Sequence, residues 1–199
     1  KFVNYLLSSN LGEILIIFIA SLLGWPLPLL ALQILWINLI TDGLPALALG
    51  IDPISKGIMS LKPRDPKEHI VSKNMSLKII FMGILICIAT LTLFKQYLPD
   101  LEKARTIAFT SLVVFELVRV YMVRSQYKLS VFSNKYLIGA VTISILLQII
   151  VVYSPLNIIF QTTPLSMFEW LYIALTAVIM FIIGTITIPL IKKITHQTD

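Results

Sequence analysis

Charged residues are scarce in this sequence: only 13% of its 199 residues are Asp, Glu, Lys or Arg, whereas 57% are hydrophobic. A soluble domain carries about 25% charged residues, so the composition indicates a protein that is solvated by a lipid bilayer. The apolar runs are too long for the strands of a membrane barrel, and they show no alternation of period two. Because only helices then satisfy the backbone within lipid, we expect an all-α fold.

Cysteine and histidine are also scarce. The single cysteine, Cys87, lies in an apolar run and cannot form an internal disulfide, and the two histidines, His69 and His196, lie in polar segments. Zinc and copper sites, which use thiolate and imidazole ligands, are therefore not expected. The net charge of +6 does not indicate a nucleic-acid partner, because the basic residues form no patch interleaved with aromatic residues.

Long apolar segments are what the sequence has instead. Each is close to the roughly 20 residues that a helix needs to cross the hydrocarbon core. We therefore expect a polytopic bundle of six transmembrane helices, in contact with membrane lipid. The predicted spans are residues 2–23, 27–50, 77–94, 105–123, 136–153 and 167–191.

The connections between these segments alternate in charge. Residues 24–28 and 154–164 contain no Lys or Arg, whereas residues 51–76, residues 124–135 and the C-terminal tail are basic. The positive-inside rule then places both termini and the 51–76 loop in the cytoplasm. Because Lys1 stands one residue before a membrane span, we expect residues 1–199 to be one membrane domain of a longer polypeptide.

Three carboxylates fall inside predicted spans: Glu13, Asp42 and Glu116. A charged residue near the centre of a membrane helix costs about 2.5–3.5 kcal/mol, so these side chains need compensation. Polar neighbours share their helix faces. Asn10 lies three residues before Glu13, and Thr41 and Asp42 lie three and four residues after Asn38.

A helix break follows Asp42. Gly43 relaxes the backbone, and Pro45 cannot donate a hydrogen bond to the preceding turn. Backbone freed at membrane depth is tolerated only where it faces protein, water or an ion. Carboxylate, amide, hydroxyl and main-chain oxygens suit a hard cation such as Ca²⁺, which takes six to eight oxygen ligands. The stretch "NLITDGLPALALG" is therefore interpreted as a broken helix that presents oxygens to a cation.

Structural interpretations of the same residues remain open. A membrane Asn or Thr often only forms a hydrogen bond between helices. Glu116 could pair with Arg119 one turn later, and a Gly-Pro break could be a packing kink.

The stretches "YLLSSNLGE" and "LQILWINLITDGLPALALGIDP" resemble the fifth and sixth transmembrane helices of P-type calcium-transporting ATPases of the sarco/endoplasmic-reticulum type and its bacterial and archaeal relatives. "IMSLKPRDPKE" is similar to the cytoplasmic loop after the sixth helix, and "FELVRVYMVRS" to the eighth. The resemblance covers the whole chain, most strongly residues 5–75. It implies that the six segments are helices five to ten of a ten-helix transport domain.

The resemblance implies roles for individual residues. The first calcium site would be formed by Asn10, Glu13, Thr41, Asp42 and Glu116, and Asn38 and Asp42 would belong to the second. Arg119 would oppose an ion in the first site if it faced inward, which leaves open whether one or two ions bind. The coupling loop, with Lys62, Arg64, Asp65 and Lys67, would touch the phosphorylation domain.

The intact protein would be a P-type Ca²⁺-transporting ATPase that uses ATP and Mg²⁺ in cytoplasmic domains outside this chain. Its N-terminal part would supply helices one to four and the phosphorylation, nucleotide-binding and actuator domains, so this chain alone is expected to hydrolyse no ATP. Two alternatives remain at this point. One is a standalone, non-catalytic membrane protein that binds cations, and the other is the same pump segment with Mn²⁺ as its ion.

Overall fold

The computed structural model describes residues 1–53, 71–127 and 129–194. Six helical segments are long and apolar enough to cross a membrane, which confirms the predicted all-α architecture. Five are continuous: α1 (Phe2–Leu22), α4 (Lys73–Tyr97), α5 (Leu101–Ser125), α6 (Lys135–Tyr153) and α8 (Met167–Ile194). The second span, Ala31–Gly50, consists of α2 (Ala31–Trp36), a π-helical segment (Ile37–Thr41) and α3 (Gly43–Gly50). Two short elements, a 3₁₀ turn (Val131–Ser133) and α7 (Leu156–Phe160), lie in the connections.

Three helix starts differ from the predicted spans by four residues, and α6 begins one residue early, at Lys135. Helix α2 begins at Ala31 rather than Leu27, since a proline disfavours the helical conformation of the residue before it and Leu27 precedes Pro28. Helices α4 and α5 begin four residues before the predicted spans, because each has a polar N-cap that hydropathy cannot detect. Ser72 accepts the N–H of Met75, and Asp100 accepts the N–H of Lys103.

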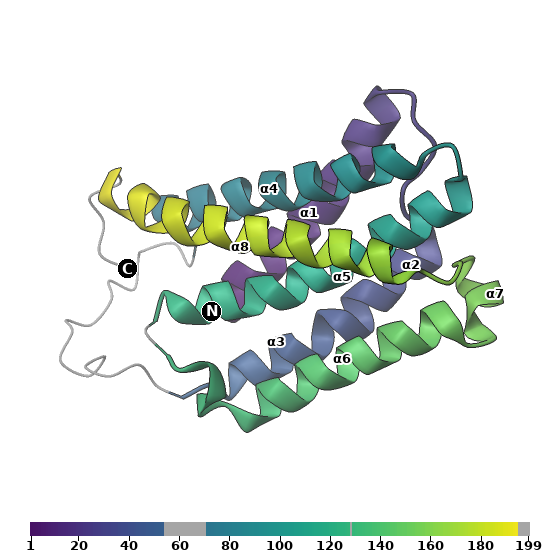
Figure 1. The fold of residues 1–199 in the computed structure, drawn as a ribbon. Helices are drawn as coiled ribbons and strands as arrows, with labels where there is room; N and C mark the ends of the chain where they lie inside the picture. Colours follow the sequence, from purple (N-terminus) through teal and green to yellow (C-terminus); the bar gives the residue numbers. More distant parts are fainter. Residues whose placement is uncertain (54–70, 128, 195–199) are drawn as a thin grey trace.

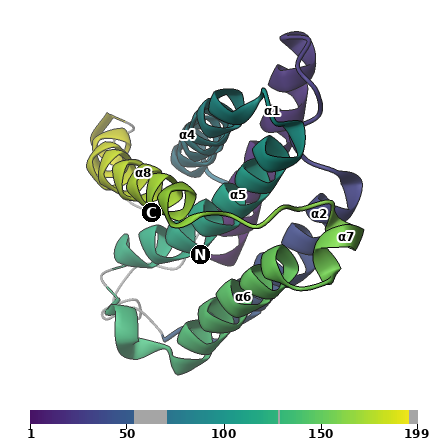
Figure 2. The same ribbon diagram turned by 45° about the vertical axis from the view of Figure 1, so that its right-hand side comes forward.

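Helix α5 is the central element of the bundle. Figures 1 and 2 show it between a group formed by α1, α4 and α8 and a second group formed by α3 and α6. Helix α5 contacts helices of both groups, and its membrane span is the most buried of the six. Aromatic rings extend the core towards the 154–166 connection: Phe160 stacks with Phe109 at 6.3 Å and meets the edge of Trp36 at 5.0 Å.

An ion-pair network closes the end of the bundle where α3 finishes. The carboxylate of Asp52 accepts hydrogen bonds from Lys1 Nζ (2.8 Å), Arg124 Nε (3.1 Å) and Asn134 Nδ2 (3.0 Å). Its side chain is only 1% exposed. Burial raises the pKa of Asp52, but the hydrogen bonds from Lys1 and Asn134 and the charge of Arg124 outweigh burial, so its pKa lies below the usual value. The network therefore ties the end of α3 to α1, α5 and α6.

Helices α1 and α4 approach closely at two glycines. A Cβ added to Gly12 would lie 3.1 Å from Cγ2 of Ile86, and one added to Gly83 would lie 2.9 Å from Cγ of Leu11. Membrane helices lack a hydrophobic driving force for association, so small residues that permit dense packing stabilise their contacts.

We predict that Gly83→Ala destabilises the bundle, because the new methyl group would force Leu11 and α1 away from α4. Overpacking of this kind costs about 1–3 kcal/mol, and the measurement is the melting temperature in detergent. Gly139→Ala is the matched control, since no atom lies within 4 Å of a Cβ at that position in α6. An unchanged melting temperature for Gly83→Ala would show that the two helices are not in close contact there.

Candidate functional site

The interruption of the second span is a π-helical turn. The N–H of Asp42 donates to the carbonyl of Ile37 at 2.8 Å, five residues earlier instead of four. Pro45 has no N–H for the Thr41 carbonyl, but it lies in the first turn of α3, where proline is tolerated. The irregular segment thus immediately precedes Gly43 and Pro45, the residues predicted to break the helix. Single π turns within helices occur frequently at functional sites.

Three carboxylates from three elements meet at this turn. Glu13 comes from α1, Asp42 from the junction of the π turn with α3, and Glu116 from α5. One oxygen from each lies within 4.8 Å of the other two. The residues are 5%, 0% and 0% exposed, respectively. Residues 103 positions apart in the sequence therefore form one acidic cluster in the apolar interior, which we call the carboxylate cluster.

Hydrogen bonds satisfy only part of the carboxylate cluster. Asn38 Nδ2 donates to Glu13 Oε2 at 2.7 Å, and the hydroxyl of Tyr5 donates to Asp42 Oδ1 at 2.5 Å. Among the described residues, five buried oxygens here have no hydrogen-bond partner. They are Glu13 Oε1, Thr41 Oγ1, Asp42 Oδ2 and both carboxylate oxygens of Glu116. A buried acceptor without a donor is unfavourable, so these oxygens are open to a proton or a metal ion.

Arg119 does not neutralise the carboxylate cluster. Its guanidinium is fully buried and donates from Nε to Ser8 Oγ (3.2 Å) and from Nη2 to Asn4 Oδ1 (2.8 Å), both on α1. Within the described part of the chain, no Lys or Arg nitrogen lies within 4.0 Å of a carboxylate oxygen of Glu13, Asp42 or Glu116. The alternative in which Arg119 pairs with Glu116 is therefore wrong.

The six predicted ligands do not all lie in the carboxylate cluster. The carboxylate cluster contains three of them, and Asn38 is hydrogen-bonded to it. Thr41 is buried beside Asp42 in the chain. Asn10 is half-buried, and its amide donates to the carbonyl of Leu6 on its own helix at 2.8 Å. The predicted coupling-loop residues Lys62, Arg64, Asp65 and Lys67 lie outside the described residues.

Sequence reasoning missed the polar residues that α1 contributes around the carboxylate cluster. Tyr5, which binds Asp42, received no role, and neither did Asn4 and Ser8, which bind Arg119. The signal was present as helical spacing: Asn4 and Ser8 are four residues apart, and Tyr5 lies eight residues before Glu13. A search for polar stripes at this spacing would have identified them.

The arrangement is chemically suited to a hard divalent cation. The side-chain atoms available to bind a metal in the carboxylate cluster are oxygens, and the low local dielectric strengthens their attraction for a cation. The π turn brings these oxygens together from separate elements.

Comparison with known proteins gives a consistent family assignment. The family model described as "Cation transporting ATPase, C-terminus" matches residues 26–190. The chain is 44% identical over 193 residues to a calcium-transporting ATPase of Bacillus subtilis, which covers 92% of this chain and 22% of that protein. It is 37% identical to calcium-transporting ATPase 1 of Bacillus cereus, covering 97% of this chain and 24% of the relative. It is 39% identical to the human calcium-transporting ATPase type 2C member 1, covering 87% and 20%, respectively. The chain thus spans only 20–24% of the length of these relatives.

We predict that Tyr5→Phe destabilises the protein, because Asp42 Oδ1 would lose its hydroxyl donor in a buried position. An unsatisfied buried acceptor costs about 1–3 kcal/mol, more when it is charged, and the melting temperature in detergent measures the loss. Tyr121→Phe is the control, since the described structure gives the half-buried hydroxyl of Tyr121 no hydrogen bond. Equal losses in both variants would mean that the bond to Asp42 is not responsible.

Proposed function

The chain belongs to the cation-transporting ATPase family, as part of the C-terminal membrane domain, and from this premise we propose that it is the transport half of an ATP-driven calcium pump. The observation that supports this proposal most directly is the carboxylate cluster at the π turn. Three buried carboxylates, brought together without a cationic side chain, form a binding site for the transported ion. Ca²⁺ is the substrate of this site, and the relatives are named as calcium-transporting ATPases.

The ligands follow from the oxygens that lack donors. Ca²⁺ would bind the carboxylate oxygens that have no hydrogen-bond partner on Glu13, Asp42 and Glu116, and Thr41 would add its hydroxyl. Asn38 would contribute its amide oxygen, which takes no part in the hydrogen bond that its Nδ2 donates to Glu13. Ca²⁺ prefers six to eight oxygens at about 2.3–2.6 Å, so side chains, main-chain carbonyls and water together complete the shell. By the resemblance, Asn10 joins Glu13, Thr41, Asp42 and Glu116 at a first site, and Asn38 and Asp42 serve a second.

The negative charge of the carboxylate cluster must be compensated at every stage of transport. A divalent cation offsets the carboxylates while it is bound, and its release leaves negative charge in a low-dielectric interior. Protons that replace the released ion would restore the balance, so the pump would exchange Ca²⁺ for protons. The energy would come from ATP, used with Mg²⁺ in the part of the pump outside this chain.

The proposed orientation places both ends of this chain in the cytoplasm, as the positive-inside rule indicates. Residues 51–76 would then meet the phosphorylation domain through Lys62, Arg64, Asp65 and Lys67. Because α3 ends directly before this loop and begins directly after Asp42, movement of the loop would be transmitted along α3 to the carboxylate cluster.

We predict that Asp42→Asn in the intact pump lowers ATP-driven calcium uptake into vesicles by more than tenfold. The reason is that a carboxylate ligand is lost, and even residues that only support metal ligands contribute about 10–100-fold. Asp100→Asn is the matched control: Asp100 is an exposed N-cap outside the carboxylate cluster, and Asn caps as well as Asp. Uptake by Asp42→Asn at the wild-type rate, with normal expression and melting temperature, would overturn the proposed site.

The same assay separates calcium from manganese, which also accepts oxygen ligands. We predict that Ca²⁺ supports uptake by the unmodified pump and that an equal concentration of Mn²⁺ reduces calcium uptake by less than half. Preferential uptake of Mn²⁺ would assign the site to manganese and would leave the family assignment unchanged.

A further inference from the structure

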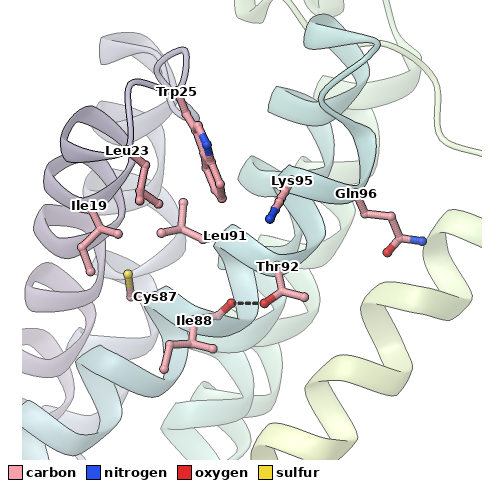
Figure 3. A pocket seen from close by; sticks show the side chains of 9 residues that line it. All are labelled: Ile19, Leu23, Trp25, Cys87, Ile88, Leu91, Thr92, Lys95 and Gln96. Atoms are coloured by element: carbon pink, nitrogen blue, oxygen red, sulfur yellow. Dashed lines mark hydrogen bonds between the residues drawn. The ribbon is translucent and has the colours of Figure 1, made fainter.

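A groove of about 640 Å³ lies between α1 and α4, away from the carboxylate cluster. Its floor and walls are apolar side chains of the two helices, including Ile19, Leu23, Ile88 and Leu91. Figure 3 shows that Trp25 and Lys95 stand at one end of the groove and that the amine of Lys95 points towards the space between the helices. The volume is within the range of about 300–1,000 Å³ that is typical of small-molecule sites.

We propose that this groove binds an anionic phospholipid, with an acyl chain along the apolar walls and the headgroup phosphate at Lys95. Leu23 and Ile88 are 55% and 58% exposed within this chain, so the chain leaves the apolar surface of the groove uncovered. The acyl chain of a lipid matches this surface in shape and polarity.

The charge at the end of the groove selects the headgroup. Lys95 lies in the last turn of α4, and its Nζ stands 5.6 Å from the ring centroid of Trp25. No carboxylate lines the groove, and among the described residues none lies within 4.0 Å of Lys95 Nζ. The cation therefore has an aromatic ring beside it but no counter-ion. A lipid with net negative charge supplies one, whereas a zwitterionic headgroup brings its own cation near the lysine.

The depth of these residues fits a lipid headgroup. Trp25 lies just beyond the end of α1, and Lys95 lies two residues before the end of α4. Tryptophan and lysine at helix ends are the side chains that anchor membrane proteins at the interface. The groove thus runs from the headgroup region into the hydrocarbon, as a bound phospholipid does.

The experiment is photo-cross-linking of the intact pump in phosphatidylcholine vesicles. Traces of phosphatidylglycerol or phosphatidylcholine carry a photoreactive group on the acyl chain, and mass spectrometry measures the labelled peptides from the C-terminal halves of α1 and α4. We expect phosphatidylglycerol to label these peptides more than phosphatidylcholine does, and Lys95→Gln to lower the phosphatidylglycerol label about fivefold, the loss expected when one lysine that attracts an anionic headgroup is removed.

Lys135→Gln is the matched control, because Lys135 is also exposed and stands 5.3 Å over an aromatic ring, that of Tyr136, but lies outside the groove. It should leave the label unchanged. Ile88→Trp, which fills the groove, should reduce labelling by both lipids. Equal labelling by the two lipids that is insensitive to Lys95→Gln would mean ordinary lipid contact and would overturn the proposal. Absence of labelling at these peptides would overturn it as well, since the rest of the pump would then cover the groove.

Discussion

The repulsion among three carboxylates in an apolar interior is the constraint on which the rest of the structure depends. One oxygen each of Glu13, Asp42 and Glu116 lies close enough to the other two for a single ion to contact all three, and each residue is almost fully buried. Such charges are stable at membrane depth only when a proton or a cation accompanies them. A site that must exchange a bound cation for protons is well suited to carry ions across a membrane.

Arg119, which is buried one turn from Glu116, is held apart from this cluster by α1. Asn4 and Ser8 accept hydrogen bonds from Nη2 and Nε of this guanidinium on α5. The α1–α5 contact therefore separates a fixed positive charge from a group of negative charges. Had Arg119 paired with Glu116, an internal counter-ion would have reduced the attraction of the cluster for a divalent cation. Asn4 and Ser8 of α1 thus influence the charge balance of the site although they do not belong to the carboxylate cluster.

The sequence was sufficient to predict the six spans and the carboxylates, because apolar length and charge at membrane depth are local properties. It was not sufficient to predict the hydrogen bonds that depend on packing between helices. The partners of Arg119 lie more than a hundred residues away on α1, whereas the sequence places only Glu116 one turn from it and so suggested that pair. The hydroxyl of Tyr5 was missed for the same reason, since an aromatic residue in a span usually faces lipid or core. Gly43 and Pro45 indicated an irregular helix, but only the backbone hydrogen bond from Asp42 to Ile37 identifies the irregularity as a π turn.

The π turn changes which residues of the second span can face the protein. In a regular α-helix, adjacent residues point about 100° apart, so a narrow inward stripe includes only one of them. Before the turn, the buried positions of this span follow steps of four at Gln33, Ile37 and Thr41; after Asp42, the buried residues of α3 come in adjacent pairs, Pro45 with Ala46 and Ala48 with Leu49. The extra residue in the turn shifts the helical phase by one position. Two consecutive residues, Thr41 and Asp42, are consequently both directed inward, and a single span presents two neighbouring oxygen-bearing side chains at the same depth.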